Sequence, residues 1–542
     1  MILVQIYSCP TLKKKKKKKI NIKKKYLKKN FGIYLFLINE KQLVYMINIK
    51  VLRFNPKEDE KPYFKSYEIE KTEQMKVLDA LTTINKKYNE DISFRSSCRA
   101  GQCGSCSLKV NGNGTLACKE EINNNDIIEP LDLPIIKDLI VDRSDYENKV
   151  KDLTLQLNNP ETHELNLNLN PEKTEDTRKV RTCIECYSCL SSCPVLNDFK
   201  DKYAGPYFMR YISKFEYDPR NESDRLKQIL DEGLYSCTSC RKCEEVCPKN
   251  ICIYGKAIEK IRGMVVEGNL GPLDPHKAIK ESISKTNRSV SYDEDIGSFI
   301  EDINKDKKGK KSKVALFTGC MVDYRLPHVG NALIDVCKAN NIDIDVPEGQ
   351  VCCGSPLLRT GQKDIIQKLA NINQEVFKDY DTIITICAGC GATLKNDYPK
   401  YGFDANIMDV SEFLLDKLDT SKMKKINKTV TWHDPCHLIR GQNVSEQPRK
   451  IIEMIPSIEF NEMEHPAQCC GAGGGVKSGH PEIAMSLSKD RVNEIKNTDA
   501  ETVLSICPFC QRNIQDGLDA EGLSNINVIN LIELLKEAYE EN

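Results

Sequence analysis

The stretch GQVCCGSPLL, residues 349–358, places two cysteines, Cys352 and Cys353, directly before a glycine. The same arrangement returns in AQCCGAGGG, residues 467–475, with Cys469 and Cys470. Three interpretations of adjacent cysteines are open: a buried structural pair, a strained vicinal disulfide, or two ligands of one metal site. The other cysteines of the chain distinguish between them.

Both pairs lie inside an internal repeat. The stretch KVALFTGCMVD from Lys313 matches TVTWHDPCHLI from Thr429, and each is a strand that ends in cysteine. Each copy continues with a helical stretch, the CCG motif, another helix, a strand (TIITIC, TVLSIC) and a Cys-x-x-Cys motif. Corresponding cysteines are 116 to 120 residues apart. The pattern predicts two copies of one α/β unit, at 313–428 and 429–542.

Each copy holds five of these cysteines, which we name the first and second five-cysteine sets. The first set is Cys320, Cys352, Cys353, Cys387 and Cys390, and the second is Cys436, Cys469, Cys470, Cys507 and Cys510. Tetrahedral zinc accepts only four ligands. Adjacent cysteines on a strand would point apart, whereas at a glycine turn both can face one centre. The pattern therefore favours a shared multinuclear metal site.

Two further runs, CIECYSCLSSCP and CTSCRKCEEVCP, have the C-x2-C-x2-C-x3-C-P spacing of bacterial ferredoxins. In such pairs the fourth cysteine of each run binds the cluster of the other run. We therefore predict two [4Fe–4S] clusters. One is assigned to Cys183, Cys186, Cys189 and Cys247, and the other to Cys193, Cys237, Cys240 and Cys243.

A fourth group, Cys98, Cys103, Cys106 and Cys118, has the spacing of a plant-type [2Fe–2S] site. Gly101 and Gly104 fit this prediction because glycine allows unusual backbone angles and a close approach of N–H groups to sulfide. The alternating stretches INIKVLRFN and KPYFKSYEIE predict a β-hairpin, and EQMKVLDALTTINKKYN predicts a helix. The remaining cysteines, Cys9, Cys252 and Cys337, belong to none of these sets, and we do not expect them to bind metal.

These motifs resemble two known families. The N-terminal half resembles the iron–sulfur subunits of succinate dehydrogenase and fumarate reductase, although many of those subunits lack a counterpart of Cys240 and hold [3Fe–4S] there. The CCG repeats resemble the twin cysteine-rich domains of the heterodisulfide reductase catalytic subunit, in which each complete set binds a noncubane [4Fe–4S] cluster. The resemblance implies an α+β multidomain fold. Its parts are a β-grasp [2Fe–2S] domain at 46–148, an α-helical two-cluster ferredoxin domain at 149–295, a linker at 296–312 and the two CCG domains.

The order of parts over residues 46–542 resembles the B subunits of the thiol:fumarate reductase family of methanogenic archaea. That resemblance implies oxidation of coenzyme M and coenzyme B thiols to their heterodisulfide at the two five-cysteine sets. Electrons would pass through the [4Fe–4S] and [2Fe–2S] centres to a flavoprotein, the fumarate reductase A subunit, which carries FAD and reduces fumarate to succinate. Two alternatives remain: an iron–sulfur subunit of a succinate, lactate, glycolate or glycerol-3-phosphate:quinone oxidoreductase, and a zinc-stabilised scaffold.

Charge is distributed unevenly along the 542 residues. Residues 1–45 carry thirteen lysines and one acidic residue, and the remainder carries 66 basic and 78 acidic residues, a net charge of −12. We interpret residues 1–45 as a disordered tail from a misassigned start, with Met46 beginning the folded protein, rather than as a nucleic-acid tether. No apolar stretch reaches the roughly 18–20 residues of a membrane helix. We expect a cytoplasmic protein without a membrane span or nucleic-acid partner.

Two histidines, His433 and His437, flank Cys436. Two roles remain open for them: donating protons or binding an anionic substrate in catalysis, or supporting the structure and hydrogen-bonding cluster sulfur. Arg359, Lys395, Arg440 and Lys477 also lie near cysteine motifs in the sequence. Solvated surface charge is the expected outcome for each of these four.

Overall fold

The computed structural model describes residues 45–151, 153, 171–218, 221, 223–305 and 312–540. The lysine-rich tail with Cys9 and residues 306–311 of the expected linker lie outside the described residues. The chain divides into two compact units. Unit 1 comprises Met1–Cys193, Pro206–Glu222 and Lys242–Ile253, and unit 2 comprises Pro194–Gly205, Ser223–Arg241 and Tyr254–Asn542.

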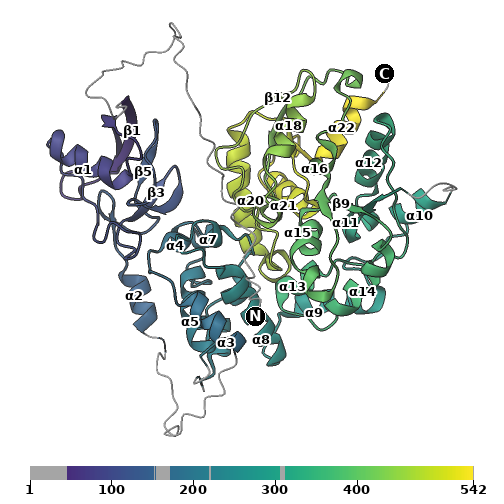
Figure 1. The fold of residues 1–542 in the computed structure, drawn as a ribbon, viewed down its shortest axis with the longest axis horizontal. Coiled ribbons are helices and arrows are strands. Elements are labelled where there is room, and N and C mark those ends of the chain that lie inside the picture. Colours follow the sequence, from purple (N-terminus) through teal and green to yellow (C-terminus); the bar gives the residue numbers. More distant parts are fainter. Residues whose placement is uncertain are drawn as a thin grey trace, which may run out of the picture. The chain divides into compact units, whose positions relative to one another are not determined.

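Unit 1 begins with a mixed five-stranded sheet of order β2-β1-β5-β3-β4, drawn in purple and blue in Figure 1. The predicted hairpin is confirmed, because β1 (Tyr45–Arg53) pairs antiparallel with β2 (Tyr63–Lys71). The predicted helix α1 (Val77–Lys87) buries Leu78 and Leu81. The other strands are β3 Ser107–Val110, β4 Asn113–Leu116, β5 Ile127–Glu129, β6 Ile135–Lys137 and β7 Ile140–Val141. The other helices are α2 Ser144–Lys151, α3 Pro171–Val180, α4 Ser188–Ser191, α5 Pro206–Glu216 and α7 Lys242–Glu245.

Unit 2 contains two parallel sheets, one for each predicted repeat. In the first, β9 (Thr382–Thr385) lies between β8 (Val314–Phe317) and β10 (Ile407–Asp409). In the second, the order is β12-β11-β13-β14, with strands β11 Thr429–Trp432, β12 Glu459–Phe460, β13 Thr502–Leu504 and β14 Asn527–Ile529. An isolated parallel bridge between Ala315 and Asp345 occupies the place that β12 takes in the second sheet. The repeat is thus confirmed at the level of sheet topology.

Helices of both repeats share one hydrophobic core, in which Trp432 is fully buried. The helix α10 (Phe299–Asn304) lies within the expected linker, and its residues Phe299 and Ile300 pack into this core. The helices of the first repeat are α11 Gly319–Tyr324, α12 Pro327–Ala339, α13 Ser355–Thr360, α14 Ile366–Phe377, α15 Ala388–Asn396 and α16 Val410–Leu414. Those of the second are α17 Cys436–Gln442, α18 Glu446–Met454, α19 Val476–Gly479, α20 Pro481–Lys496, α21 Pro508–Ala520 and α22 Leu531–Tyr539.

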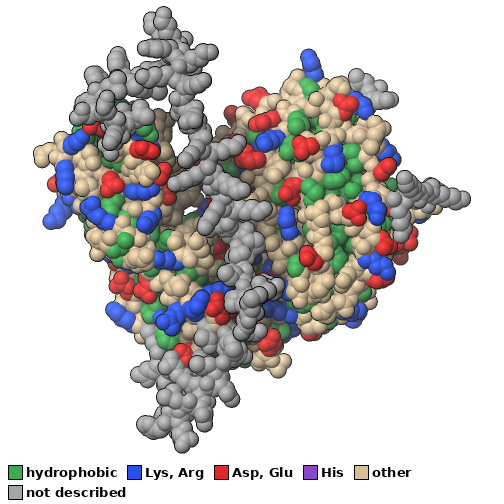
Figure 2. Space-filling view, viewed as in Figure 1, with side chains coloured by type: hydrophobic (Ala, Val, Ile, Leu, Met, Phe, Trp, Pro, Cys, Tyr) green, Lys and Arg blue, Asp and Glu red, His purple; other side chains and the backbone are tan. Residues whose placement is uncertain are grey.

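Shorter elements precede the repeats in unit 2. They include helices α6 Arg225–Asp231, α8 Lys260–Glu267 and α9 Asp274–Thr286, and the single turns Pro194–Leu196, Leu234–Ser236 and Tyr254–Glu259. Among the described residues, none of the helices combines the length and hydropathy that crossing a bilayer requires. On the face drawn in Figure 2, basic and acidic side chains are interspersed over the described surface of unit 2.

Candidate metal sites

The structure brings the five thiols of the first set together. The side chain of Cys352 hydrogen-bonds those of Cys320 and Cys353. Cys353 also hydrogen-bonds Cys390, which in turn hydrogen-bonds Cys387. The hydrogen bonds from Cys352 and Cys390 lower the pKa of Cys353 to about 5. A thiol with such a pKa is a thiolate at neutral pH, which is the form that binds metal.

The glycine after each cysteine pair makes this convergence possible. Gly354 and Gly471 have φ values of +76° and +92°, in the left-handed region that residues with a Cβ rarely enter. At Gly471 a Cβ would lie 2.6 Å from the carbonyl oxygen of Ala484. The chain therefore turns sharply after the second cysteine of each pair, and both thiols face one centre.

The second set converges in the same way. The Cys470 and Cys510 sulfurs are 3.4 Å apart, Cys510 hydrogen-bonds Cys507, and Cys469 hydrogen-bonds Cys436. The Cys510 thiol, which hydrogen-bonds Cys470, lowers the pKa of Cys470 to about 5, and His433 contributes to the same effect. Nine of the ten thiols in the two sets are buried, and Cys436 is the partly exposed member.

Parallel-strand geometry explains why the sets form where they do. Cys320 and Cys387 follow the carboxyl ends of β8 and β9, which are neighbours in one sheet. Cys387 and Cys507 also cap the N-termini of α15 and α21. Strand ends of an open α/β sheet form a crevice. Hydrogen bonds from Cys390 and Cys507 lower the pKa of Cys387, and the hydrogen bond to Cys387 raises the pKa of Cys507 to about 11. The two sets meet directly, because the Cys387 side chain hydrogen-bonds that of Cys507.

The second set also contacts the ferredoxin-like run at 237–240. The sulfur of Cys469 lies 3.4 Å from the hydroxyl oxygen of Thr238, and its side chain hydrogen-bonds Cys240. Arg440 donates a hydrogen bond of 3.3 Å to the carbonyl oxygen of Cys240. All of these residues belong to unit 2. The second set, rather than the first, therefore adjoins the upstream cysteines.

In unit 1 the structure gathers Cys183, Cys186, Cys189 and Cys247. Cys189 interacts electrostatically with the other three, so the fourth cysteine of the later run does reach the first three of the earlier run. Burial raises the pKa of Cys189 well above its ordinary value. Of the other predicted set, Cys193 and Cys243 lie in unit 1 and Cys237 and Cys240 in unit 2. The assignment of that set to one cluster stays a prediction.

The two glycines of the loop predicted to hold [2Fe–2S] have the unusual backbone angles that the sequence predicts. Gly101 and Gly104 both have φ of +70°. Backbone N–H groups of Ala100 and Gln102 donate to the sulfur of Cys98, at 3.4 and 3.3 Å. Cys103 hydrogen-bonds Cys98, and Cys106 hydrogen-bonds Cys118 and interacts with Cys103. The four thiols are thus close together, with two exposed and two buried.

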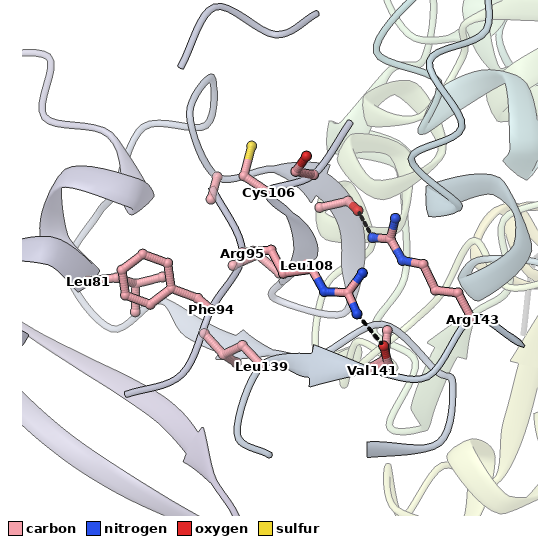
Figure 3. Close-up of a pocket in the computed structure, with 11 residues that line it drawn as sticks. Leu81, Phe94, Arg95, Cys106, Leu108, Leu139, Val141 and Arg143 are labelled. Carbon is pink, nitrogen blue, oxygen red and sulfur yellow. Dashed lines mark hydrogen bonds between the residues drawn. The ribbon is translucent and has the colours of Figure 1, made fainter. Parts of the chain in front are cut away.

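A small pocket lies behind this loop, and Figure 3 shows Cys106 and two arginines among its lining side chains. Arg143 donates a hydrogen bond of 3.1 Å to the Ser107 hydroxyl, and Arg95 donates one of 3.5 Å to the Val141 carbonyl. Burial lowers the pKa of the Arg143 guanidinium. Arg95 and Arg143 line the same pocket as Cys106, one of the predicted [2Fe–2S] ligands.

Buried arginines beside the cysteine sets show that the residues present fit anionic clusters. Arg210, Arg288 and Arg491 interact electrostatically with cysteines of three different sets. Each is buried or nearly so, and each has at least one buried guanidinium nitrogen without a hydrogen-bond partner: Arg210 Nε and Nη2, Arg288 Nη1 and Arg491 Nε. Arg288 and Arg491 also form ion pairs with Asp323 and Glu494, and a bound anionic cluster would satisfy the buried donors that remain. Sequence reasoning missed these arginines, which lie far from most of their cysteines along the chain.

The two histidines occupy different positions. The side-chain ligand atoms of His433, Cys470 and Cys510 all lie within 4.8 Å of one another. Burial lowers the pKa of His437 to about 4, and the charge of Arg359 contributes to the same effect. The expectation of solvated charge is wrong for Arg359, which is 7% exposed and forms ion pairs with Glu259 and Asp397.

Comparisons with known proteins agree with this geometry. Residues 48–148 match the 2Fe-2S iron-sulfur cluster binding domain family and residues 179–251 the 4Fe-4S dicluster domain family. Residues 314–395 and 430–515 match the cysteine-rich CCG domain family. The fold and the sites define an iron–sulfur component of an oxidoreductase that transfers electrons.

Relatives extend over nearly the whole chain. The fumarate reductase (CoM/CoB) B subunit of Methanothermobacter marburgensis is 55% identical, over 92% of this chain and 100% of its own. The D subunit of a dihydromethanophenazine:CoB–CoM heterodisulfide reductase from Methanosarcina barkeri is 31% identical over 66% of this chain and 93% of its own. A crystal structure of a hypothetical protein from Helicobacter pylori is similar in fold, with a TM-score of 0.60 at 15% identity, covering 92% of this chain and 95% of that one. This chain belongs to the family of fumarate reductase (CoM/CoB) B subunits.

Proposed function

We propose that this chain oxidises coenzyme M and coenzyme B thiols to their heterodisulfide and delivers the electrons to a flavoprotein subunit that reduces fumarate. The observation that carries the proposal is the continuity of cysteines in unit 2. The first set meets the second at Cys387 and Cys507, and the second meets Cys240 through Cys469. A thiol-handling site and the start of a path for electrons are therefore in direct contact.

The proposed cofactors are one [2Fe–2S], two [4Fe–4S] cubanes and two noncubane [4Fe–4S] clusters, with FAD on the partner subunit. When bound, such clusters accept and release electrons one at a time over a wide range of potentials. Joining two thiols into a disulfide releases two electrons and two protons, and reducing fumarate to succinate consumes two of each. The two half-reactions balance without a quinone.

The thiol substrates would approach at Cys436 and His437. Both are partly exposed, whereas the other nine thiols of the two sets are buried. With a pKa of about 4, His437 is a neutral imidazole at physiological pH. A neutral imidazole has one ring nitrogen that accepts a hydrogen bond and one that donates, so His437 would orient a substrate thiol at Cys436 rather than act as its base. Arg359, whose charge lowers the pKa of His437, is itself held in ion pairs with Glu259 and Asp397.

An anaerobic assay of the complex with its flavoprotein tests the proposal. We expect the two thiols together to support fumarate reduction, and metal analysis to give about 18 irons for each chain. Electron exchange with quinones but not with these thiols would overturn the thiol assignment. Zinc with little iron would overturn the cluster assignment.

The Cys469→Ser variant tests the proposed route. Because Cys469 joins the second set to Cys240, we expect thiol-driven fumarate reduction to fall at least a hundredfold. Fumarate reduction driven by a reduced viologen, which can donate at the upstream clusters, should stay within about twofold of wild type. The matched control is Cys337→Ser, at a buried cysteine outside both sets, which should retain thiol-driven activity. Equal loss with both donors would contradict the route.

A further inference from the structure

The two repeats differ at one position that faces the cysteines. His433 and Phe317 each lie three residues before the first cysteine of their set. Phe317 is the last residue of β8, and His433 directly follows β11. Phe317 packs in an apolar cluster with Cys353 and Cys390, the counterparts of Cys470 and Cys510. The second set therefore has an imidazole where the first has a phenyl ring.

The surroundings of His433 favour an interaction with a cluster. The side chain is 1% exposed and hydrogen-bonds the side chain of Cys470, and its buried Nδ1 atom has no partner. Its ligand atom lies within 4.8 Å of the sulfurs of both Cys470 and Cys510. A buried polar nitrogen without a partner costs free energy. A phenyl ring, as in the first repeat, would avoid that cost, so packing alone does not account for a histidine here.

We propose that His433 is a nitrogen partner of the cluster held by the second five-cysteine set, and that it makes this cluster easier to reduce than the one held by the first set. The inference rests on the proposed function, which places a cluster in each set. An imidazole that donates a hydrogen bond to cluster sulfur, or that binds iron in place of a thiolate, reduces the negative charge on the cluster. Both changes raise the reduction potential. His433 acts as a positioning and tuning residue, and Cys436 with His437 remain the substrate-facing pair.

The consequence is a direction for electrons between two otherwise similar sites. The second set is the one that contacts Cys240 through Cys469. A higher potential at the second set draws electrons from the first set toward the upstream cysteines. The difference between His433 and Phe317 thus gives the duplicated domains different roles.

The test uses the full chain, loaded with clusters under anaerobic conditions, and compares His433→Phe with the reciprocal Phe317→His. Potentials of the two C-terminal clusters are measured by redox titration followed by EPR. In His433→Phe we expect the reduction potential of one C-terminal cluster to fall by at least about 59 mV. For a one-electron couple this is a tenfold change in the ratio of reduced to oxidised cluster. In Phe317→His the other potential should rise. The packing control Phe317→Leu should leave both potentials near wild type.

A spectroscopic readout keeps the test independent of variant folding. In wild-type protein labelled with ¹⁵N-histidine, pulsed EPR should detect a histidine nitrogen coupled to one C-terminal cluster. That coupling should vanish in His433→Phe and His433→Asn and persist in His437→Asn. Unchanged potentials in His433→Phe, or no histidine coupling in wild type, would overturn the inference while leaving the proposed function intact. A wild-type chain with about 10 irons instead of about 18 would overturn both.

Discussion

Single residues decide whether ten thiols can face two centres. The cysteine pairs at 352–353 and 469–470 were predicted to share metal sites because a glycine follows each pair, and the structure gives both glycines a positive φ. The close approach of Gly471 to the backbone of Ala484 could not be read from the sequence. It depends on α20, which the chain reaches only after the motif has ended.

We predict that Gly471→Ala destabilises unit 2 by about 3 kcal/mol, because it combines left-handed strain with a backbone clash. The Cβ would lie 2.6 Å from a carbonyl oxygen that cannot move freely. The matched control is Gly522→Ala, where φ is +73° and no heavy atom lies within 4 Å of the added Cβ. The control should cost only about 1 kcal/mol. Anaerobic thermal unfolding and iron content measure both effects, and equal losses would contradict the clash.

Arg210 illustrates a residue that sequence reasoning could not single out. It is 2% exposed and lies near Cys183 and Cys189, although it comes from α5, outside both ferredoxin-like runs. Nothing in the motif spacing indicates a buried cation there. Only the folded chain brings the guanidinium to the thiols.

For Arg210→Met we predict opposite effects on two measurements. The iron-free protein should keep or gain stability, because a buried cation with unused donors has been removed. Loading of the cluster on Cys183, Cys186, Cys189 and Cys247 should weaken, because its negative charge loses a neighbour. Arg210→Lys should preserve loading better than the methionine variant does. Iron titration and thermal unfolding separate the two effects, and parallel losses of both would contradict this role.

At the scale of elements, the sequence predicted the duplicated α/β pattern of residues 313–542 but not strands β10, β12 and β14. Strand–cysteine–helix order indicated the α/β repeat, and the two parallel sheets confirm it. Helix α10 was not predicted, because the charged residues that follow Asn304 dominate the composition of that stretch. Its apolar pair, Phe299 and Ile300, is too short to show helical periodicity.

The junction of β10 and α16 should make stability depend on pH. Asp409 caps α16 and accepts hydrogen bonds from the Ser411 N–H and hydroxyl, while its Oδ2 is buried without a partner. Burial raises its pKa from 3.8 to about 7. The pKa of Asp409 is higher in the folded than in the unfolded state. The contribution of this carboxyl group to stability is therefore fully present below pH 3.8 and is lost progressively as the pH rises through 7.

We therefore predict that Asp409→Asn raises the melting temperature most at pH 8 and by a smaller amount at pH 5, where only part of the ionisation cost is present. The amide keeps an acceptor for Ser411 and cannot ionise. The gain at pH 8 is at most about 4 kcal/mol. A control at an exposed cap, Asp419→Asn, should show no such gain at pH 8, because neighbouring hydrogen bonds, first that from Ser421, lower the pKa of Asp419. A loss of stability at both pH values in Asp409→Asn would contradict the prediction.

At the scale of the whole molecule, spacing predicted groups of cysteines, of which the set Cys193, Cys237, Cys240 and Cys243 stays a prediction, and it did not predict which groups are neighbours. The assignment of Cys247 to the run at 183–189 agrees with the proximity seen in unit 1. The contacts of Cys469 with Cys240, and of Cys387 with Cys507, join segments 229 and 120 residues apart, and no local pattern encodes them. Which sites are neighbours depends on the tertiary structure, and this proximity determines the order in which electrons would pass between the clusters.

The two units differ in how much structure depends on metal. Around Cys183–Cys189 and Cys243–Cys247, the helices α4 and α7 have only four residues each, too few to be stable without external support. The sheets of unit 2 lie instead on a large apolar core that includes Trp432. Cluster binding should therefore supply most of the folding free energy around α4 and α7 and much less of it at β9 and β13.

We predict that anaerobic iron chelation abolishes hydrogen-exchange protection at α4 and α7 while β9 and β13 keep most of theirs. The exchange of Ile384 and Val503, fully buried strand residues, serves as the internal reference. Rebinding of iron and sulfide should restore protection at the short helices, which separates metal dependence from irreversible damage. Simultaneous loss of protection in all four elements would mean that the apolar core of unit 2 cannot hold its sheets without clusters, and would contradict this division of stability.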